Sequence, residues 1–391
     1  MQKSVHRAEQ VEAQLLGANP VRSGDFNQRL VLQAIQAKGT TTGRDIAEQT
    51  GLSHQAALNI VKRLSDDGFV IGAGKVSGQR GQPALRLQLN PDGAYALGLN
   101  IDRDHLVLVV IDLLGKVRHR VYRDIAYPLP RDVVEFVLQE TREIFDKRRI
   151  KKEKICGLGI AMPDGIWHHL NDTTPGGYDQ WKMVDIGTIV GSLLDLPVFI
   201  QNDASASAIG ERHLGRGADY KTFVYLVISA GVGCGLIVDG KPFTHGLNHA
   251  GEIGNIPVRV TGQRKAILWN ALSLFALYET VAAAGVQVSR PEELVESNPV
   301  IVAAVKTWIE KAIPAALPAL LALNYILSPE TVFVGGQLPS FVVENLCREL
   351  NAAMDASRTF MPMMSFQSAT TSVDAAALGA ATVALIGKVF L

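Results

Sequence analysis

One glutamate of the chain, Glu252, lies in the segment HAGEIGNIPV (249–258), with Gly251 before it and Gly254 two residues after it. Glycine lets a backbone approach a bound molecule closely, because it has no Cβ atom. A carboxylate at such a place can accept hydrogen bonds from a ligand, take part in a proton transfer, or simply face water. The segment therefore marks Glu252 as a candidate ligand-binding or catalytic residue.

A second polar segment, QNDAS (201–205), places Asn202 and Asp203 directly after the apolar stretch PVFI. An amide beside a carboxylate suits binding of adjacent hydroxyl groups, and an aspartate can accept the proton of a hydroxyl group that attacks a phosphate. The same pattern is typical of a helix N-terminus, where Asp203 would act as the cap. These residues alone leave both interpretations open.

Two glycine-rich turns follow predicted strands, SAGVGCG (229–235) and VGGQL (334–338). Such turns can bring backbone N–H groups to a phosphate or a ribose. Glycine turns also occur where chains simply pack tightly, so each motif is weak by itself. The candidate nucleotide-binding residues are Gly231, Gly233, Gly335 and Gly336.

The elements that must position these residues alternate between strands and helices. Strands are predicted within 95–117, 154–162, 197–204, 222–240 and 330–340, and helices at about 131–148, 204–214, 266–284 and 298–323. This alternation is typical of an α/β body, and two sets of it favour two lobes around a cleft. We expect the body to span 95–391, with lobes at about 95–200 plus the C-terminal helix and at about 201–370.

The first 90 residues carry four more positive than negative charges, although the whole chain has a formal net charge of zero. A basic module at one end is compatible with nucleic-acid contact there. Within residues 26–90, Thr42 and Ser53 are candidate N-caps, and Gly51 ends the helix between them. Two short helices around a glycine indicate a helix-turn-helix, or else a small three-helix packing element with solvated faces.

In a helix-turn-helix the second helix enters the major groove of DNA. The residues that would contact bases or phosphates from this helix are Ser53, His54, Gln55, Ala56, Asn59, Lys62 and Arg63. The stretch that follows, 69–89, alternates apolar and polar residues around a glycine-rich tip and predicts a β-hairpin wing. Arg80 at the tip suits a narrow minor groove, or is a solvated loop arginine. We interpret 26–90 as a winged helix-turn-helix and 1–25 as an arm of undetermined structure.

The winged helix is followed in order by NPDGAYALGLNID, LPVFIQNDASASAIGE, HAGEIGNIPV and VFVGGQL, and with them it resembles the ROK family of repressors and sugar kinases over residues 26–391. The resemblance implies an actin-like, two-lobed ATPase fold. It also implies that Asn202, Asp203 and Glu252 bind sugar hydroxyls, with Asp203 as the general base of a kinase. Members with a winged helix are typically sugar-responsive repressors, and members without one are typically sugar kinases.

The chain departs from this family where phosphates would bind. Kinase members carry a glycine-containing DIGGTK-like loop, whereas this chain has NIDRDH (100–105), with Asp102 and Asp104. Two like charges at ~4 Å repel by roughly 1 kcal/mol even in water. The second turn has Ala230 where kinases have a threonine. Because phosphoryl transfer depends on positioning and neutralising phosphates, we expect little or no kinase activity.

The family's zinc site is also missing from the sequence. Asn255 stands where most members have a histidine, and the stretch after it has no cysteine, so a tetrahedral zinc site of that type cannot form. Gly177 stands near the place of a sugar-binding asparagine in many members. We expect no cofactor, and an effector pocket that includes Asn255 and Gly177 and is reshaped for another polyol or a sugar derivative.

The remaining features favour a soluble cytoplasmic protein. The three cysteines are far apart, the N-terminus lacks a signal peptide, and the apolar run 313–327 is short and contains two prolines, so a buried helix is expected there. The sequence predicts a sugar-responsive transcriptional regulator, a repressor, acting as a homodimer or homotetramer on operator DNA and a carbohydrate-like effector, without a membrane. The alternatives are an ATP-dependent sugar kinase with Asp203 as base, and a DNA-binding protein with a vestigial ligand site.

Overall fold

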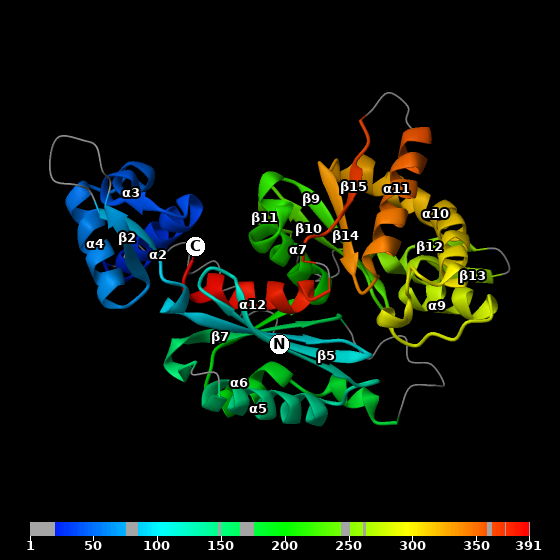
Figure 1. Ribbon diagram of the computed structural model, residues 1–391, viewed down its shortest axis with the longest axis horizontal. Helices are drawn as coiled ribbons and strands as arrows, with labels where there is room; N and C mark the ends of the chain where they lie inside the picture. The colour runs from blue at the N-terminus through cyan, green and yellow to red at the C-terminus, as the bar shows by residue number, and fades with distance from the viewer. Residues whose placement is uncertain are drawn as a thin grey trace, which may run out of the picture. The chain divides into compact units, whose positions relative to one another are not determined.

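A computed structural model describes residues 20–75, 85–147, 150–164, 176–243, 251–260, 263–357, 362–371 and 373–390. Arg80 and residues 1–19 of the predicted arm lie outside the described residues. The chain divides into two compact units (Figure 1). The first unit consists of Met1–Tyr95, Asp112–Lys116 and Leu385–Leu391, and the second of Ala96–Ile111 and Val117–Ala384.

The first unit combines three helices with a small antiparallel sheet. The helices are α2 (Pro20–Lys38), α3 (Gly43–Thr50) and α4 (His54–Asp66), and the strands lie in the order β1 (Thr41–Thr42), β3 (Leu85–Leu89) and β2 (Val70–Lys75). Thr42 caps α3, since its side chain accepts from Asp45 N while Asp45 accepts from Thr42 N. Ser53 caps α4 through Ala56 N. Both predicted caps are confirmed, and Gly51 ends α3 at φ 70°.

An apolar core holds this unit together. Val31, Ile35, Ile46, Val61 and Leu64 are each at most 6% exposed. Burying such a side chain stabilises a fold by about 1.5–3 kcal/mol. The C-terminal segment belongs to the same unit, because the Arg29 guanidinium donates to the carbonyls of Gly387 and Phe390 at 3.3 and 3.4 Å.

The second unit begins with a five-stranded sheet in the order β6-β5-β4-β7-β8. Its strands are β4 (Tyr95–Ile101), β5 (His105–Asp112), β6 (Val117–Asp124), β7 (Ile155–Met162) and β8 (Val198–Asn202). Figure 1 shows α5 (Pro130–Lys147) and α6 (Ile186–Leu194) along one face of this sheet and α12 (Ala375–Lys388) along the other. Gly98 and Gly159 permit the close approach of α12, because a Cβ at either would collide with its backbone carbonyls.

A second five-stranded sheet has the order β11-β10-β9-β14-β15. Its strands are β9 (Phe223–Ile228), β10 (Val232–Val238), β11 (Lys241–Pro242), β14 (Thr331–Gly336) and β15 (Ser365–Ser368), and a separate pair is β12 (Pro257–Val260) with β13 (Gln263–Ile267). The helices that accompany them are α7 (Asp203–Leu214), α8 (Trp269–Leu272), α9 (Leu274–Ala283), α10 (Pro299–Leu327) and α11 (Ser340–Ala356). Short 3-10 helices are η2 (Pro91–Gly93), η3 (Lys152–Lys154), η4 (Tyr178–Lys182), η5 (Arg216–Asp219), η6 (Ile253–Asn255) and η7 (Pro291–Glu293).

The largest apolar cluster packs β9 and β14 against α9, α10 and α11. The predicted apolar run forms the C-terminal half of α10 and contributes buried residues to this cluster, as expected. Trp308 of α10 is 2% exposed, and its Nε1 donates to Ala271 O at 3.0 Å. Among the described helices, none is both long enough and apolar enough to cross a bilayer.

The helix predicted at 266–284 is interrupted. Strand β13 ends at Ile267, the short α8 follows, and Ser273 then caps α9 by accepting from Ala276 N at 3.2 Å. A serine that caps a new helix satisfies N–H groups that the preceding turn cannot. The interruption places Trp269 at the start of α8, beside the site described next.

Candidate functional site

A cavity of about 360 Å³ lies in the second unit where several strands end. Its polar and charged lining residues are Asp102, Arg103, Asp164, Asn202, Asp203, Ser229, Glu252 and Asn255, and Trp269 completes it with smaller residues that include Gly231 and Gly233. The structure thus brings together the residues that follow β4 and β7, the end of β8, the β9–β10 turn and η6. Such a concave place with a few convergent polar groups is typical of a small-molecule site.

Four predicted ligand-binding residues meet in this cavity: Asn202, Asp203, Glu252 and Asn255. We call them the amide–carboxylate cluster. Glu252 accepts a hydrogen bond at Oε2 from Asn255 Nδ2 at 3.0 Å. The amides and carboxylates of the cluster offer both donors and acceptors, which is the chemistry that neighbouring hydroxyl groups require.

The cap of α7 is Asn202 and not Asp203. Asn202 Oδ1 accepts from Ser205 N at 3.0 Å, and its Nδ2 donates to Asp164 Oδ2 at 3.3 Å. Asp203 Oδ1 accepts only a local bond from Ala204 N at 2.9 Å among the hydrogen bonds of the described residues. The capping interpretation of Asp203 is therefore wrong, because its neighbour already fills that position.

The glycines around Glu252 line the cavity, as expected of backbone that can approach a ligand, and they also permit close packing on β10. Gly251 has φ 91°, and a Cβ there would collide with the carbonyl of Cys234. A Cβ at Gly254 would collide with the carbonyl of Val232. Both glycines thus let the Glu252 segment pack directly against β10, which fixes the position of the carboxylate.

Asp203 lies in an acidic environment. Burial, followed by the nearby Asp102 and then Glu252, raises the pKa of Asp203 to about 7, against a smaller opposing effect of Arg103. Burial and the neighbouring Asp104 also raise the pKa of Asp102. A carboxyl group with a pKa near neutrality can exchange a proton under physiological conditions, as a general base must.

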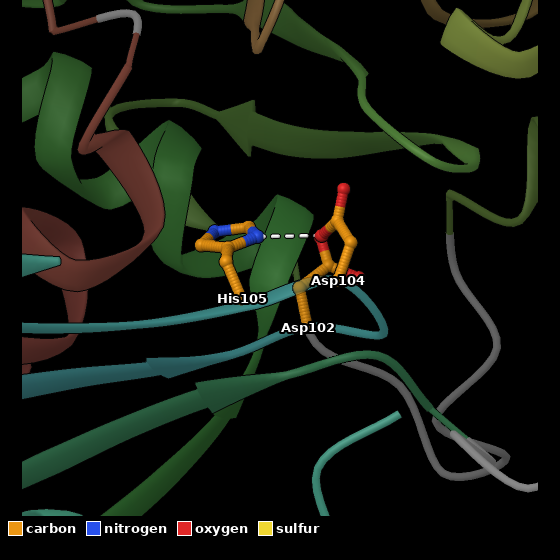
Figure 2. Close-up of side chains that lie close together, drawn as sticks. All are labelled: Asp102, Asp104 and His105. Carbon is orange, nitrogen blue, oxygen red and sulfur yellow. Dashed lines mark hydrogen bonds and ion pairs between the residues drawn. The ribbon is translucent and has the colours of Figure 1, made fainter. Parts of the chain in front are cut away.

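The residues of the NIDRDH turn are held by side-chain contacts with one another and with Gln337. We call Asn100, Asp104, His105 and Gln337 the phosphate-turn cluster, whereas Asp102 of the same turn lines the cavity. Figure 2 shows His105 and Asp104 facing each other, with His105 Nδ1 at 2.6 Å from Asp104 Oδ1. Gln337 Nε2 lies 2.9 and 3.2 Å from the two ring nitrogens, and Asn100 Nδ2 lies 3.2 Å from His105 Nε2. The contact between His105 and Gln337, which are 232 positions apart in the chain, therefore joins the NIDRDH turn directly to the VGGQL turn.

His105 is the centre of this cluster. It is 2% exposed and stacks on Tyr122 with ring centroids 5.4 Å apart. Burial lowers the pKa of His105, but the hydrogen bond to Asp104 and the charges of Asp102 and Asp104 outweigh it and raise the pKa above its ordinary value. The buried oxygens of Asn100 and Gln337 have no hydrogen-bond partner, and rotating either amide by 180° would let that oxygen accept from a protonated ring.

Three residues of the NIDRDH turn form the donor set of a cation site. Asp102, Asp104 and His105 place one ligand atom each within 4.8 Å of one another. Carboxylate oxygens and an imidazole nitrogen suit several divalent metal ions. In the structure, however, the ring nitrogen nearest the carboxylates is already bonded to Asp104.

The predicted glycines differ in their surroundings. Gly231 and Gly233 line the cavity. Gly335 and Gly336 are not among its lining residues, and a Cβ at either would collide with Tyr225 Oη or with the carbonyl of Ile228. Gly177, with φ 91°, begins η4 and does not line the cavity either.

Several lining residues had no predicted role as ligand contacts, among them Asp164, Trp269 and Arg103. Asp164 lies just after the end of β7, and Asn202 lies at the end of β8. A polar residue at the end of a predicted strand was therefore a signal in the sequence that could have identified Asp164. Trp269 donates from Nε1 to Ala230 O at 2.6 Å, and Arg103 lies over its ring at 5.6 Å from the centroid. No local pattern pointed to Trp269, because its place depends on the break between β13 and α9.

Apart from Arg80, which lies outside the described residues, the predicted DNA-contact residues belong to helix α4 and its N-cap. Ser53, His54, Gln55, Asn59, Lys62 and Arg63 are exposed and Ala56 is partly exposed, whereas Ala57, Val61 and Leu64 of the same helix are buried. Gln55 Nε2 donates to Asn59 Oδ1 at 3.1 Å. Helix α4 therefore offers a polar face with two basic residues, opposite the face that packs on the unit's core.

Family models match both units. A model described as ROK family matches residues 96–386. A model described as winged helix-turn-helix DNA-binding matches residues 27–71. The two matches follow each other along the chain in the predicted order, with the winged helix first and the ROK body after it.

Relatives and solved structures agree with these matches. A xylose repressor of Caldicellulosiruptor bescii is 26% identical over 60% of this chain, and the aligned stretch spans 59% of that relative. The structure described as a ROK family transcriptional regulator, homolog of the E. coli MLC protein, has a TM-score of 0.69 at 21% identity and covers 93% of this chain and 96% of that one. The structure of a ROK family glucokinase from Streptomyces griseus, in complex with glucose and AMPPNP, has a TM-score of 0.61 at 18% identity. It covers 74% of this chain and 99% of that one. The fold is a winged helix-turn-helix followed by a ROK sugar-kinase-like α/β body.

Proposed function

Because the chain belongs to the ROK family, we propose that it is a sugar-responsive transcriptional repressor that binds operator DNA through its winged helix and a carbohydrate-like effector in the cavity. One observation carries this proposal. The amide–carboxylate cluster faces an open cavity, whereas the phosphate-turn cluster is joined by the contact between His105 and Gln337. The hydroxyl-binding residues of a kinase site are present, whereas the NIDRDH turn, where kinases bind phosphates, carries the carboxylates of Asp102 and Asp104.

The DNA-binding part of the proposal is supported by α3 and α4. The second helix of a helix-turn-helix presents its N-terminal residues to base edges, and His54 and Gln55 are exposed there. Lys62 and Arg63 lie about two turns further along the helix, where they can reach phosphates. Relatives such as the xylose repressor carry the name of a sugar-controlled DNA-binding protein.

The effector-binding part is supported by Asn202, Asp203 and Glu252. Their side chains line one cavity, and the backbone that carries each is fixed, by the start of α7 for the first two and by packing on β10 for the third. Preorganised polar groups bind a ligand with little cost in ordering. We propose that the effector's hydroxyl groups bind these three residues.

We further propose that the protein acts as a homodimer or homotetramer. A symmetric dimer of helix-turn-helix units reads half-sites about 34 Å apart, so a small effector-driven change of spacing prevents simultaneous contact. Release from the operator on effector binding would follow from this geometry.

A second function, ATP-dependent sugar kinase, is favoured by the pKa of Asp203 near 7, which suits a general base. Incubation with ATP, magnesium and a panel of sugars, followed by measurement of ADP, tests it. We expect no ADP above the background of an Asp203→Asn variant. Sugar-dependent ADP release that this variant abolishes would replace the repressor by a kinase that also binds DNA.

The decisive experiment for the repressor is selection of fragments of the source genome with the purified full chain at about 0.15 M salt, near physiological ionic strength. We expect an inverted repeat to be enriched, and expect Gln55→Ala with Asn59→Ala to abolish the enrichment. Glu48→Gln, an exposed change on α3, is the matched control. No enrichment over random fragments would contradict the proposal.

A further inference from the structure

The cavity carries an excess of negative charge. Four carboxyl groups line it, those of Asp102, Asp164, Asp203 and Glu252, and the one positively charged side chain among its described lining residues is Arg103. Ionised carboxylates accept hydrogen bonds and donate none. Burial and mutual repulsion raise the pKa of Asp102 and of Asp203, so a ligand rich in donors and free of negative charge complements this lining in its ionised form.

Two of these carboxylates accept their hydrogen bonds from neutral backbone groups, and for Asp102 burial and the charge of Asp104 raise the pKa more than His105 and Arg103 lower it. Asp102 is 5% exposed and accepts from the backbone N–H of Arg103 at 2.7 Å. Asp203 accepts from the backbone N–H of Ala204 at 2.9 Å. Both donors are neutral groups, so they satisfy an oxygen atom without cancelling its charge.

The positive charge of Arg103 does not neutralise the negative charge of the four carboxyl groups. Its guanidinium lies over the ring of Trp269, 5.6 Å from the centroid. Its lowering effect on the pKa of Asp203 is smaller than the raising effects of burial, Asp102 and Glu252, which bring that pKa to about 7. The carboxylates thus repel one another in the structure, and a cation placed among them would relieve that repulsion.

We propose that the effector is a polyol that carries a protonated amine, of the amino-sugar or aminocyclitol class, and that its ammonium group binds beside Asp102 and Asp203. This inference rests on the proposed function, since it takes the cavity as the effector site. An ammonium group has three donors and no acceptor, which complements an acceptor-rich lining. The amide nitrogens of Asn202 and Asn255 donate to Asp164 and Glu252, and each has a second N–H that can donate to a hydroxyl group of the ligand.

The charge of Asp102 and Asp203 also excludes some effectors. Sugar phosphates and uronic acids would bring a further negative charge into a partly buried acidic cavity, where repulsion is stronger than in water. An N-acetylated sugar replaces the ammonium by a neutral amide with one donor and an added acceptor, so it lacks the complementarity. The order of affinity expected is amine, then neutral sugar, then anionic sugar.

Calorimetry with the full chain tests this order. The probes are glucosamine, glucose, N-acetylglucosamine and glucose 6-phosphate, and the same four forms of the galactose and mannose series, at about pH 7, below the ordinary pKa of an α-amino group. In at least one series we expect the amine to bind about 10-fold more tightly than either neutral form, with no binding of the phosphate. Equal or tighter binding of a neutral form would overturn the inference and leave the sugar-responsive repressor intact.

Asp102→Asn is the matched variant, because it removes one charge and keeps the shape of the side chain. We expect it to lower the affinity for the amine about 10-fold and to change the affinity for the neutral parent less than about 2-fold. Asp146→Asn, an exposed change on α5, is the control and should change neither. Operator binding by each variant verifies folding, and Asp164→Asn takes the place of Asp102→Asn if the latter does not fold.

Two further outcomes separate this inference from the function on which it rests. Tight binding of MnCl2 or MgCl2 alone, abolished by Asp102→Asn, would assign the positive charge to a metal ion and overturn the amine. Failure of every probe, cationic and neutral, in a protein that selects an operator would overturn both the amine and the sugar response, while the DNA-binding role would stand.

Discussion

The amide–carboxylate cluster and the phosphate-turn cluster lie in the same unit and are both acidic, yet their side chains have different partners. Asn202, Asp203 and Glu252 face an open cavity. His105 and Gln337 face each other, across 232 positions of the chain. An acidic group that faces a cavity can bind a ligand, whereas an acidic group bonded to a buried histidine contributes to stability. The comparison underlies our proposal that this kinase-like body keeps recognition of a ligand and lacks a working site for phosphates.

The largest expected effect comes from Glu252→Gln. Losing a charged acceptor of ligand hydroxyls costs about 1.5–3 kcal/mol, so affinity for the tightest sugar or amino sugar of the panel should fall about 10- to 100-fold. Calorimetry measures this, and operator affinity should stay unchanged. Glu279→Gln, an exposed change on α9, is the control. Unchanged affinity in Glu252→Gln would remove Glu252 from the binding site and break the comparison.

The second effect concerns the phosphate-turn cluster. His105→Ala leaves Asp104 and Gln337 without their buried partner, so the free energy of unfolding should fall by about 1–3 kcal/mol, as urea denaturation would show. Ligand affinity should change by less than about 3-fold. His54→Ala, exposed on α4, controls for loss of a histidine as such. A loss of ligand affinity as large as that of Glu252→Gln would place the two clusters in one site.

The third effect is a pH dependence of stability. The pKa of Asp203 is raised to about 7 in the folded chain, so the folded state holds a proton that the unfolded state releases near pH 4. Stability from this group is therefore present at low pH and lost as the pH rises toward 7. Asp203→Asn should have the melting temperature of the wild type at about pH 4 and exceed it by about 2–4 °C at about pH 8. An offset that is the same at both pH values would show that Asp203 does not titrate in this range.

The smallest effect comes from Arg103→Gln. A guanidinium over an aromatic ring contributes about 0.5–1 kcal/mol, so the free energy of unfolding should change by no more than that. Affinity for an amine should rise about 3-fold, because the cavity loses its positive side chain, while affinity for the neutral parent should not change. Calorimetry on the same sugar series measures both. A fall in amine affinity would mean that Arg103 binds the ligand directly.

Local chemistry determined a large part of the molecule from the sequence alone. The caps at Thr42 and Ser53 and the left-handed Gly51 are short-range features, so α3 and α4 could be predicted from neighbouring residues. The strand ends that carry Asn202 and the segment of Glu252 were likewise marked by their own residues. The resemblance of these segments, taken in their order, to the ROK family predicted the fold, and the family match over residues 96–386 confirms it.

Tertiary structure decided what those residues contact. The glycines beside Glu252 permit packing on β10, and Asn202, not Asp203, caps α7. Gly335 and Gly336 permit close packing against β9. The bond between His105 and Gln337 and the place of Trp269 in the cavity join elements far apart in sequence. No local pattern encodes such contacts, because they arise only when the strands are paired and their ends meet. The sequence therefore determined which chemical groups the protein has, and the folded sheets determined which of them face a ligand and which face one another.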